Sequence, residues 1–146
     1  MNAVTAPASS TLDFARASTA DVAALLLRST LGVMFLAHGL LKIAVFTLPG
    51  TTAFFESLGF PGWTAYVVAP AEVLAGAALL LGFQTRAVAL ASLPILIGSL
   101  VAHAGNGWLF SNANGGWEFP VFLIATAVVV ASLGGGRLAM TPRPLA

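Results

Sequence analysis

The chain has 146 residues, of which 58% are hydrophobic and only 8% are charged. Soluble domains carry about 25% charged residues, so this composition argues against a water-soluble protein and predicts one domain embedded in a lipid bilayer. The net charge of +1 gives no indication of nucleic-acid binding, and the lack of cysteine excludes disulfides and cysteine-ligated iron–sulfur clusters within the chain.

The first 20 residues are rich in Ala, Ser and Thr, which is typical of a mobile tail. Asp13 and Arg16 precede the first hydrophobic run, so the segment lacks the basic start and compact apolar stretch of a signal peptide. We expect a membrane domain over residues 21–137, followed by a C-terminal tail over 138–146.

Four segments approach the roughly 20 apolar residues that a membrane-spanning helix needs. They are about 22–46, 64–83, 87–104 and 118–135. The segments show no alternating pattern and are too few to close a barrel. The sequence therefore predicts an all-α membrane protein with a four-transmembrane-helix bundle, in which a tight turn joins spans two and three as an antiparallel hairpin.

The other two connections are longer and differ in composition. Residues 47–63 contain several large apolar side chains beside Glu56, which predicts a short helix lying in the membrane interface between the first two spans. Those side chains are Phe54, Phe55, Leu58 and Phe60. Residues 105–116 are rich in Gly and Asn, which is typical of an irregular, exposed loop.

The distribution of positive charge predicts the orientation. The opposite side offers only Lys42, whereas the side that holds both termini carries Arg16, Arg86, Arg137 and Arg143. Because positive charge is retained in the cytoplasm, we expect a multi-pass protein of a bacterial-type plasma (inner) membrane with both termini cytoplasmic.

The first span carries a polar face. At 100° per residue, Arg28, His38 and Lys42 lie on one side of the helix with small residues, and the opposite side is aliphatic. A charge at the bilayer centre costs about 2.5–3.5 kcal/mol on insertion scales, so we expect this face to turn into the bundle. Arg28 and Lys42 have the alternative of reaching the headgroups.

Glu72 lies near the midpoint of the second span, too deep to reach the headgroups. Antiparallel pairing would set it level with about Phe35, within reach of Arg28 or His38. A buried carboxylate must be paired or protonated, and Arg28 keeps its charge. The sequence therefore predicts an Arg28–Glu72 pair, either as part of a functional site or as a structural lock.

His103 ends the third span and Glu118 opens the fourth, both on the predicted outer side. Charge compensation at a helix N-terminus would explain Glu118, and His103 could be an interfacial residue without chemistry. Together with His38 and Lys42, they could instead line one outward-facing cavity. Nothing besides the two histidines favours haem, and we predict no metal site.

The order of these residues resembles the DoxX family of small four-helix membrane proteins. The resemblance covers roughly residues 24–140. Its matching stretches are Arg28 to Lys42, Glu72 to Gly76, Gly82 to Arg86, and His103 through Asn106-Gly107-Trp108 to Trp117-Glu118-Phe119-Pro120. The family pattern usually closes with an acidic stretch, whereas Gly134-Gly135-Gly136 is here followed by Arg137.

The resemblance implies a quinone-linked role. Family members are subunits of quinone-reducing oxidoreductases or act in tolerance to quinones and oxidative stress, and some form complexes with soluble redox or thiol-handling proteins. Besides the lipid bilayer, we therefore expect a soluble redox partner or a homo-oligomer. A fold by itself does not fix a reaction.

Our first hypothesis is a membrane subunit of a quinone-linked oxidoreductase, with a polar cavity that receives a quinone headgroup. His38 and Glu72 are the candidate catalytic residues, because they could deliver protons. Arg28 or Lys42 could hydrogen-bond a quinone carbonyl. The candidate cofactor-binding residues are Arg28, Lys42, His103 and Glu118. No cofactor motif is recognisable, so electrons must come from elsewhere. The alternatives are a non-catalytic scaffold or assembly subunit, and a small-solute or proton pathway.

Overall fold

The computed structural model describes residues 17–141, and all regular structure in this range is helical. The helices are α1 (Thr19–Leu40), α2 (Leu48–Ser57), α3 (Thr64–Leu81), α4 (Thr85–His103) and α5 (Glu118–Leu133). A π-helical segment, η2 (Leu41–Val45), prolongs α1, and a 3-10 turn, η3 (Ala104–Asn106), prolongs α4. The predicted all-α fold class is confirmed.

Three of these helical stretches are long and apolar enough to cross a membrane: Thr19–Val45, Thr64–Leu81 and Thr85–Asn106. The fourth, α5, is apolar but has only 16 residues. At 1.5 Å per residue it is about 24 Å long, which is shorter than the roughly 30 Å of a hydrocarbon core.

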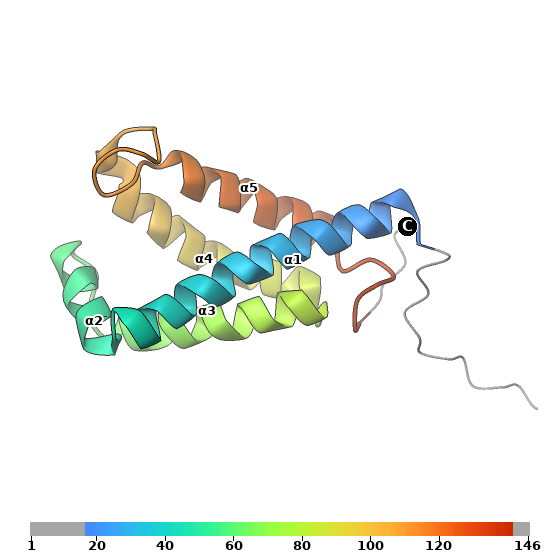
Figure 1. Ribbon diagram of the computed structural model, residues 1–146, viewed down its shortest axis with the longest axis horizontal. Helices are drawn as coiled ribbons and strands as arrows, with labels where there is room; N and C mark the ends of the chain where they lie inside the picture. Colours follow the sequence, from blue (N-terminus) through green and yellow to red (C-terminus); the bar gives the residue numbers. More distant parts are fainter. Residues whose placement is uncertain (1–16, 142–146) are drawn as a thin grey trace, which may run out of the picture.

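The four long helices form two arms. The first arm consists of α1 packed along α3, and the second consists of α4 packed along α5. Figure 1 shows the arms as a V that closes near both ends of the described chain and opens towards α2. We call these the closed end and the open end. The predicted tight turn lies between α3 and α4, but it joins the two arms instead of lying within one.

Glycines allow α1 and α3 to pack closely. A Cβ atom added at Gly76 would lie 2.5 Å from the backbone nitrogen of Leu36, and one added at Gly39 would lie 2.8 Å from the carbonyl oxygen of Ala69. Real Cβ atoms do not approach backbone this closely, so any larger residue would push the helices apart. Small residues at helix crossings are a usual means of helix association in membranes.

We expect Gly76→Ala to lower the free energy of unfolding by about 1–3 kcal/mol, the usual cost of overpacking. The matched control is Gly98→Ala on α4, where an added Cβ would meet nothing within 4 Å. There alanine should be neutral or stabilising by up to about 1 kcal/mol, because it favours helix more than glycine does. Thermal unfolding in detergent measures both. Equal melting temperatures for the two variants would contradict the close approach of α1 and α3.

Specific contacts hold both described ends of the chain to the bundle. Helix α1 starts at Thr19 because Ser18 and Asp21 form a capping box, in which each side chain accepts from the other residue's backbone N–H. At the other terminus, Leu138 and Ala139 are buried, although they belong to the expected tail. The expected tail residues 1–16 and 142–146 lie outside the described range.

The closed end is densely packed. The cluster of buried apolar residues joins all four long helices and consists of Leu31, Phe35, Leu79, Ala89, Leu96, Ala127 and Val130. After α5 the chain folds back over this end, where the N–H of Met140 donates to the carbonyl of Leu81 and that of Thr141 to the carbonyl of Gly82. The short helix expected before α3 is present as α2, at the open end (Figure 1).

Candidate functional site

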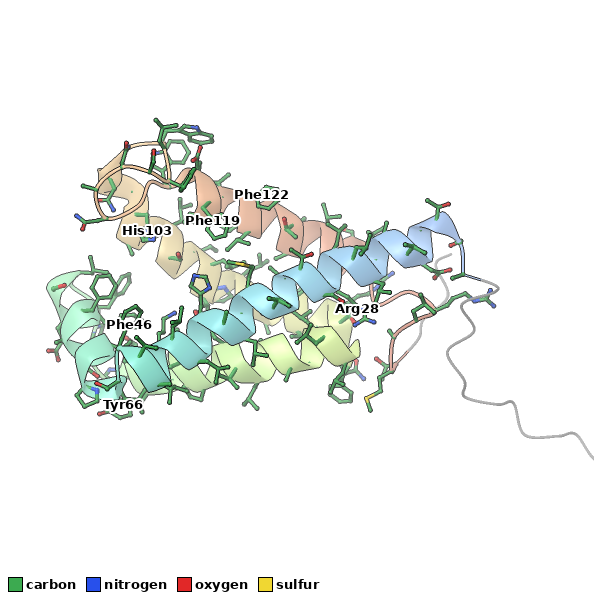
Figure 2. The ribbon with its side chains drawn as sticks, in the orientation of Figure 1. Arg28, Phe46, Tyr66, His103, Phe119 and Phe122 are labelled. Atoms are coloured by element: carbon green, nitrogen blue, oxygen red, sulfur yellow. The ribbon has the colours of Figure 1, made fainter. Side chains whose placement is uncertain are left out.

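A cavity of about 1040 Å³ lies between the two arms. Four of the six predicted site residues are in its wall: His38, Lys42 and Glu72 from the first arm, and His103 from the second. Most of the remaining wall is aromatic or aliphatic. In Figure 2, Phe46 lies on the first arm and His103 and Phe119 on the second, on the two sides of the V, whereas Arg28 lies near the closed end.

Lys42 and Glu72 form an ion pair in this wall. The ammonium Nζ lies 2.7 Å from one carboxylate oxygen of Glu72 and 2.9 Å from the other. The side chains are only 18% and 8% exposed, so the pair is largely buried, although both residues line the cavity. Both carboxylate oxygens of Glu72 accept from the ammonium of Lys42 in an apolar surrounding. This meets the rule that charges inside a membrane protein are paired.

The π-helical segment η2 and helix α2 hold the backbone of Lys42. Its carbonyl accepts a hydrogen bond of 3.0 Å from the hydroxyl of Thr51, which is 3% exposed. Thr51 therefore fastens α2 to the end of the first span. π-helical turns inside or after α-helices are frequent at functional sites, and this one carries the only basic residue of the cavity wall apart from the histidines.

The predicted Arg28–Glu72 pair is wrong. One terminal nitrogen of the Arg28 guanidinium donates to the carbonyls of Leu79 and Leu80 at 2.7 and 2.6 Å, and the other donates to the carbonyl of Leu138 at 2.8 Å. Arg28 is 2% exposed and is not part of the cavity wall. It caps the last carbonyls of α3, where a cation is favoured, and ties them to the chain after α5.

His38 has one ring nitrogen engaged and one available. Its Nδ1 lies 2.8 Å from the carbonyl of Met34, one turn earlier in α1. A carbonyl only accepts, so Nδ1 carries a proton and Nε2 is the nitrogen that can exchange a proton or bind a ligand. The imidazole is exposed in the wall of the cavity, unlike the Lys42–Glu72 pair.

Glu118 has a structural partner outside the main cavity. Its carboxylate accepts a hydrogen bond of 2.7 Å from the backbone N–H of Phe110. The same loop is fixed by a hydrogen bond from the backbone N–H of Trp117 to the carbonyl of Gly107, and by edge-to-face packing of Trp108 on Trp117 at 4.4 Å. Glu118 therefore holds the α4–α5 loop to the start of α5.

The sequence did not reveal that α2 closes part of the cavity. The wall includes Phe54 and Phe55 of α2, Leu58 and Phe60 after the helix, and Ser99 and Ala102 from α4. The cluster of aromatic residues was visible in the sequence, but it was interpreted as an interfacial segment only. Pro94 and Gly98, which also line the cavity, mark the face of α4 that faces it.

Comparisons with known sequences identify the family of the chain. The DoxX family model matches residues 23–105. The chain belongs to the DoxX family. A Bacillus subtilis (strain 168) protein named "Putative oxidoreductase CatD" is 34% identical over 122 residues, which are 84% of this chain and 87% of that protein. No solved structure matches the chain significantly. The family match includes His38, Lys42, Glu72 and His103, but it ends before α5.

Proposed function

We propose that this DoxX family protein is the membrane component of a quinone-linked oxidoreductase system and that its cavity binds the quinone headgroup. The observation that carries the proposal is the composition of the cavity wall. Three ionisable side chains of the first arm face a large space whose other walls are aromatic and aliphatic. Ligand sites usually combine such an apolar lining with a few convergent polar groups. The B. subtilis relative, whose name reads "Putative oxidoreductase CatD", supports the same class of activity.

The available donors fit a planar ring with carbonyl oxygens. The ammonium of Lys42 is a nitrogen donor in the first arm's wall, and Nε2 of His38 becomes one when the imidazole is protonated. The rings of Phe55 and Phe119 belong to the apolar remainder of the wall. A quinone accepts electrons and protons at its carbonyl oxygens. His38 would hold and transfer a proton at Nε2, and Lys42 would place positive charge beside the oxygen where negative charge develops.

Glu72 would determine whether the ammonium of Lys42 can contact a ligand in the cavity. While both carboxylate oxygens hold the ammonium, Lys42 is directed at Glu72. Protonation of Glu72 would weaken that pair and release the ammonium to a ligand. Glu72 would thus act as a proton carrier coupled to ligand binding, consistent with the default reading of ionisable residues within membranes. Electrons would come from a soluble redox partner.

We expect His38→Gln to reduce quinone-dependent activity, because glutamine keeps polarity but cannot carry a proton at neutral pH. Protein level and bound quinone should stay near those of the wild type. A loss on the order of 10²-fold or more would match the usual contribution of a general acid–base residue. The assay compares membranes adjusted to equal protein content, with Ser132→Ala, an exposed change on α5, as the control.

The double variant Lys42→Met with Glu72→Leu tests headgroup binding without leaving a charge unpaired. Quinone extracted from protein purified in mild detergent should fall well below that of the wild type. Normal quinone content and activity in both this variant and His38→Gln would refute the proposal. A scaffold or assembly role would then be favoured, with the Lys42–Glu72 pair serving only to lock α1 to α3.

A further inference from the structure

The residues that line the cavity occupy only one part of the length of the bundle. On α1 the wall extends no deeper than Leu31, and on α5 no deeper than Leu123. The residues of α3 after Glu72 and those of α4 before Pro94 contribute nothing to it. Towards the open end, by contrast, the wall continues through α2 to Phe60 and through the α4–α5 loop. Within the described residues, the cavity is therefore a pit that starts at the open end and stops inside the bundle.

The floor of this pit is tightly sealed. Between the cavity and the closed end lie Leu79, Ala89 and Ala127, each 0% exposed. Behind them, the guanidinium of Arg28 is bonded to three carbonyls, and Leu138 is 3% exposed.

Two ionisable side chains of the described residues are buried towards the closed end. Arg28 lies in the floor and does not lose its proton in proteins, and Asp21 lies two turns further towards the N-terminus, where its carboxylate accepts from the backbone N–H groups of Ser18 and Arg137. Among the described residues, no buried proton carrier lies between Glu72 and Arg28.

The pit has the size to hold water, and four ionisable groups interrupt its otherwise largely apolar wall. At about 30 Å³ per molecule, its volume of about 1040 Å³ corresponds to on the order of 30 water molecules. Its ionisable groups are His38, Lys42, Glu72 and His103. An exposed imidazole and a partly exposed ion pair are stabilised by water and disfavoured by lipid chains.

We propose that the cavity is a water-filled vestibule open only to the side of the membrane opposite the two ends of the described chain, and that His38 and Glu72 exchange protons with that side alone. The role of these protons in quinone chemistry rests on the proposed function, whereas the existence of the vestibule does not depend on that function. The positive-inside orientation expected from the sequence would make this the outer side. The proposal also excludes a continuous pathway across a single chain.

The natural absence of cysteine makes the vestibule directly testable, because each substituted cysteine is the only thiol in the chain. Ser99→Cys places a thiol in the cavity wall. Ser92→Cys is the matched control: it lies two turns deeper on the same face of α4, is 2% exposed and does not line the cavity. Ser111→Cys in the exposed α4–α5 loop reports the open-end side, and Ala146→Cys reports the side of the C-terminus.

Vesicles of both orientations are treated with a permanently charged methanethiosulfonate, and the remaining thiol is counted after denaturation. Ser99→Cys should react only in the orientation in which Ser111→Cys reacts, and roughly tenfold or more faster than Ser92→Cys, because a thiol must be accessible and ionised to react. Ala146→Cys should react only in the opposite orientation. If Ser99→Cys does not accumulate in membranes, Ala102→Cys on the same wall replaces it.

Three results would overturn the proposal. Modification of Ser99→Cys from the C-terminal side would mean that the closed end is permeable. Equal rates at positions 92 and 99 would mean that there is no floor between them. Modification from neither side would mean that lipid or protein fills the cavity. The labelling needs no quinone. Quinone content measured in the same preparations therefore tests the proposed function separately, and a lack of bound quinone would refute only that function.

Discussion

Glu72→Ala is expected to lower the free energy of unfolding by about 3–5 kcal/mol, the usual cost of removing one partner from a buried ion pair. Its ammonium partner would stay in an apolar wall with no carboxylate within 3 Å, where Lys42 now has two contacts of 2.7 and 2.9 Å. The double variant Lys42→Met with Glu72→Leu should recover most of the loss, since it removes both charges together. Thermal or denaturant unfolding in a fixed detergent measures all three variants.

A second double-mutant cycle, which combines changes at Arg28 and Glu72, supplies the control. Arg28 is bonded to three carbonyls at the closed end and to no carboxylate. The losses from Arg28→Met and Glu72→Ala should therefore add within about 0.5 kcal/mol, as they do for sites without shared partners. Strong coupling of Arg28 to Glu72, with additive losses for Lys42 and Glu72, would contradict the arrangement of charges described here.

The direction of side chains explains why the predicted partner was wrong. Side chains of an α-helix point towards its N-terminus. The glycine contacts set Glu72 nearly level with Gly39, about 15 Å along the helix from Arg28 but only about 5 Å from Lys42. The side chain of Arg28 points away from Glu72, and that of Lys42 points towards it. The predicted register, which set Glu72 level with about Phe35, is one turn away from the observed one, and a comparison of Cα depths does not include the direction of the side chains.

The helical spans were predictable because lipid requires long apolar segments with internal hydrogen bonds. The arrangement of the arms was not, since it depends on contacts between distant residues. Gly39 and Gly76 hold the first arm together, and both were recognisable as small residues on a polar face. That the second arm diverges and leaves a cavity depends on side-chain packing at the closed end. Hydrophobic pattern carries no information on this packing.

The same limit applies to the chain after α5. Residues 138–146 looked like a tail because the apolar run stops at Gly134-Gly135-Gly136. In the structure, the turn at these glycines returns the chain to the bundle, and Gly136 has a φ of 68°, which favours glycine. Leu138 then becomes buried and offers its carbonyl to Arg28. Only the fold reveals that a charged residue of the first helix has its partner 110 positions later.

Arg28→Met is expected to destabilise the closed end by about 3 kcal/mol or more, because a hydrogen bond to a charged group contributes about 1.5–3 kcal/mol and three such bonds are lost. The loss should be local at first. The amides of Met140 and Thr141, bonded to the end of α3, should exchange hydrogen faster once the carbonyl of Leu138 is no longer held. Hydrogen exchange with mass spectrometry measures this segment, and thermal unfolding measures the whole.

Two variants distinguish the contribution of the planar guanidinium from that of its positive charge and from that of its position at the closed end. Arg28→Lys keeps the charge but not the planar fork that reaches carbonyls of two segments, so its loss should lie between those of the wild type and Arg28→Met. Arg86→Met removes an exposed arginine at the same end and should change stability by less than about 1 kcal/mol. If Arg28→Lys matched the wild type, charge alone would suffice and the three-carbonyl clamp would be refuted. If exchange at residues 140–141 stayed slow in Arg28→Met, the chain after α5 would be held by Leu138 and Ala139 packing alone, and the floor of the vestibule would not depend on Arg28.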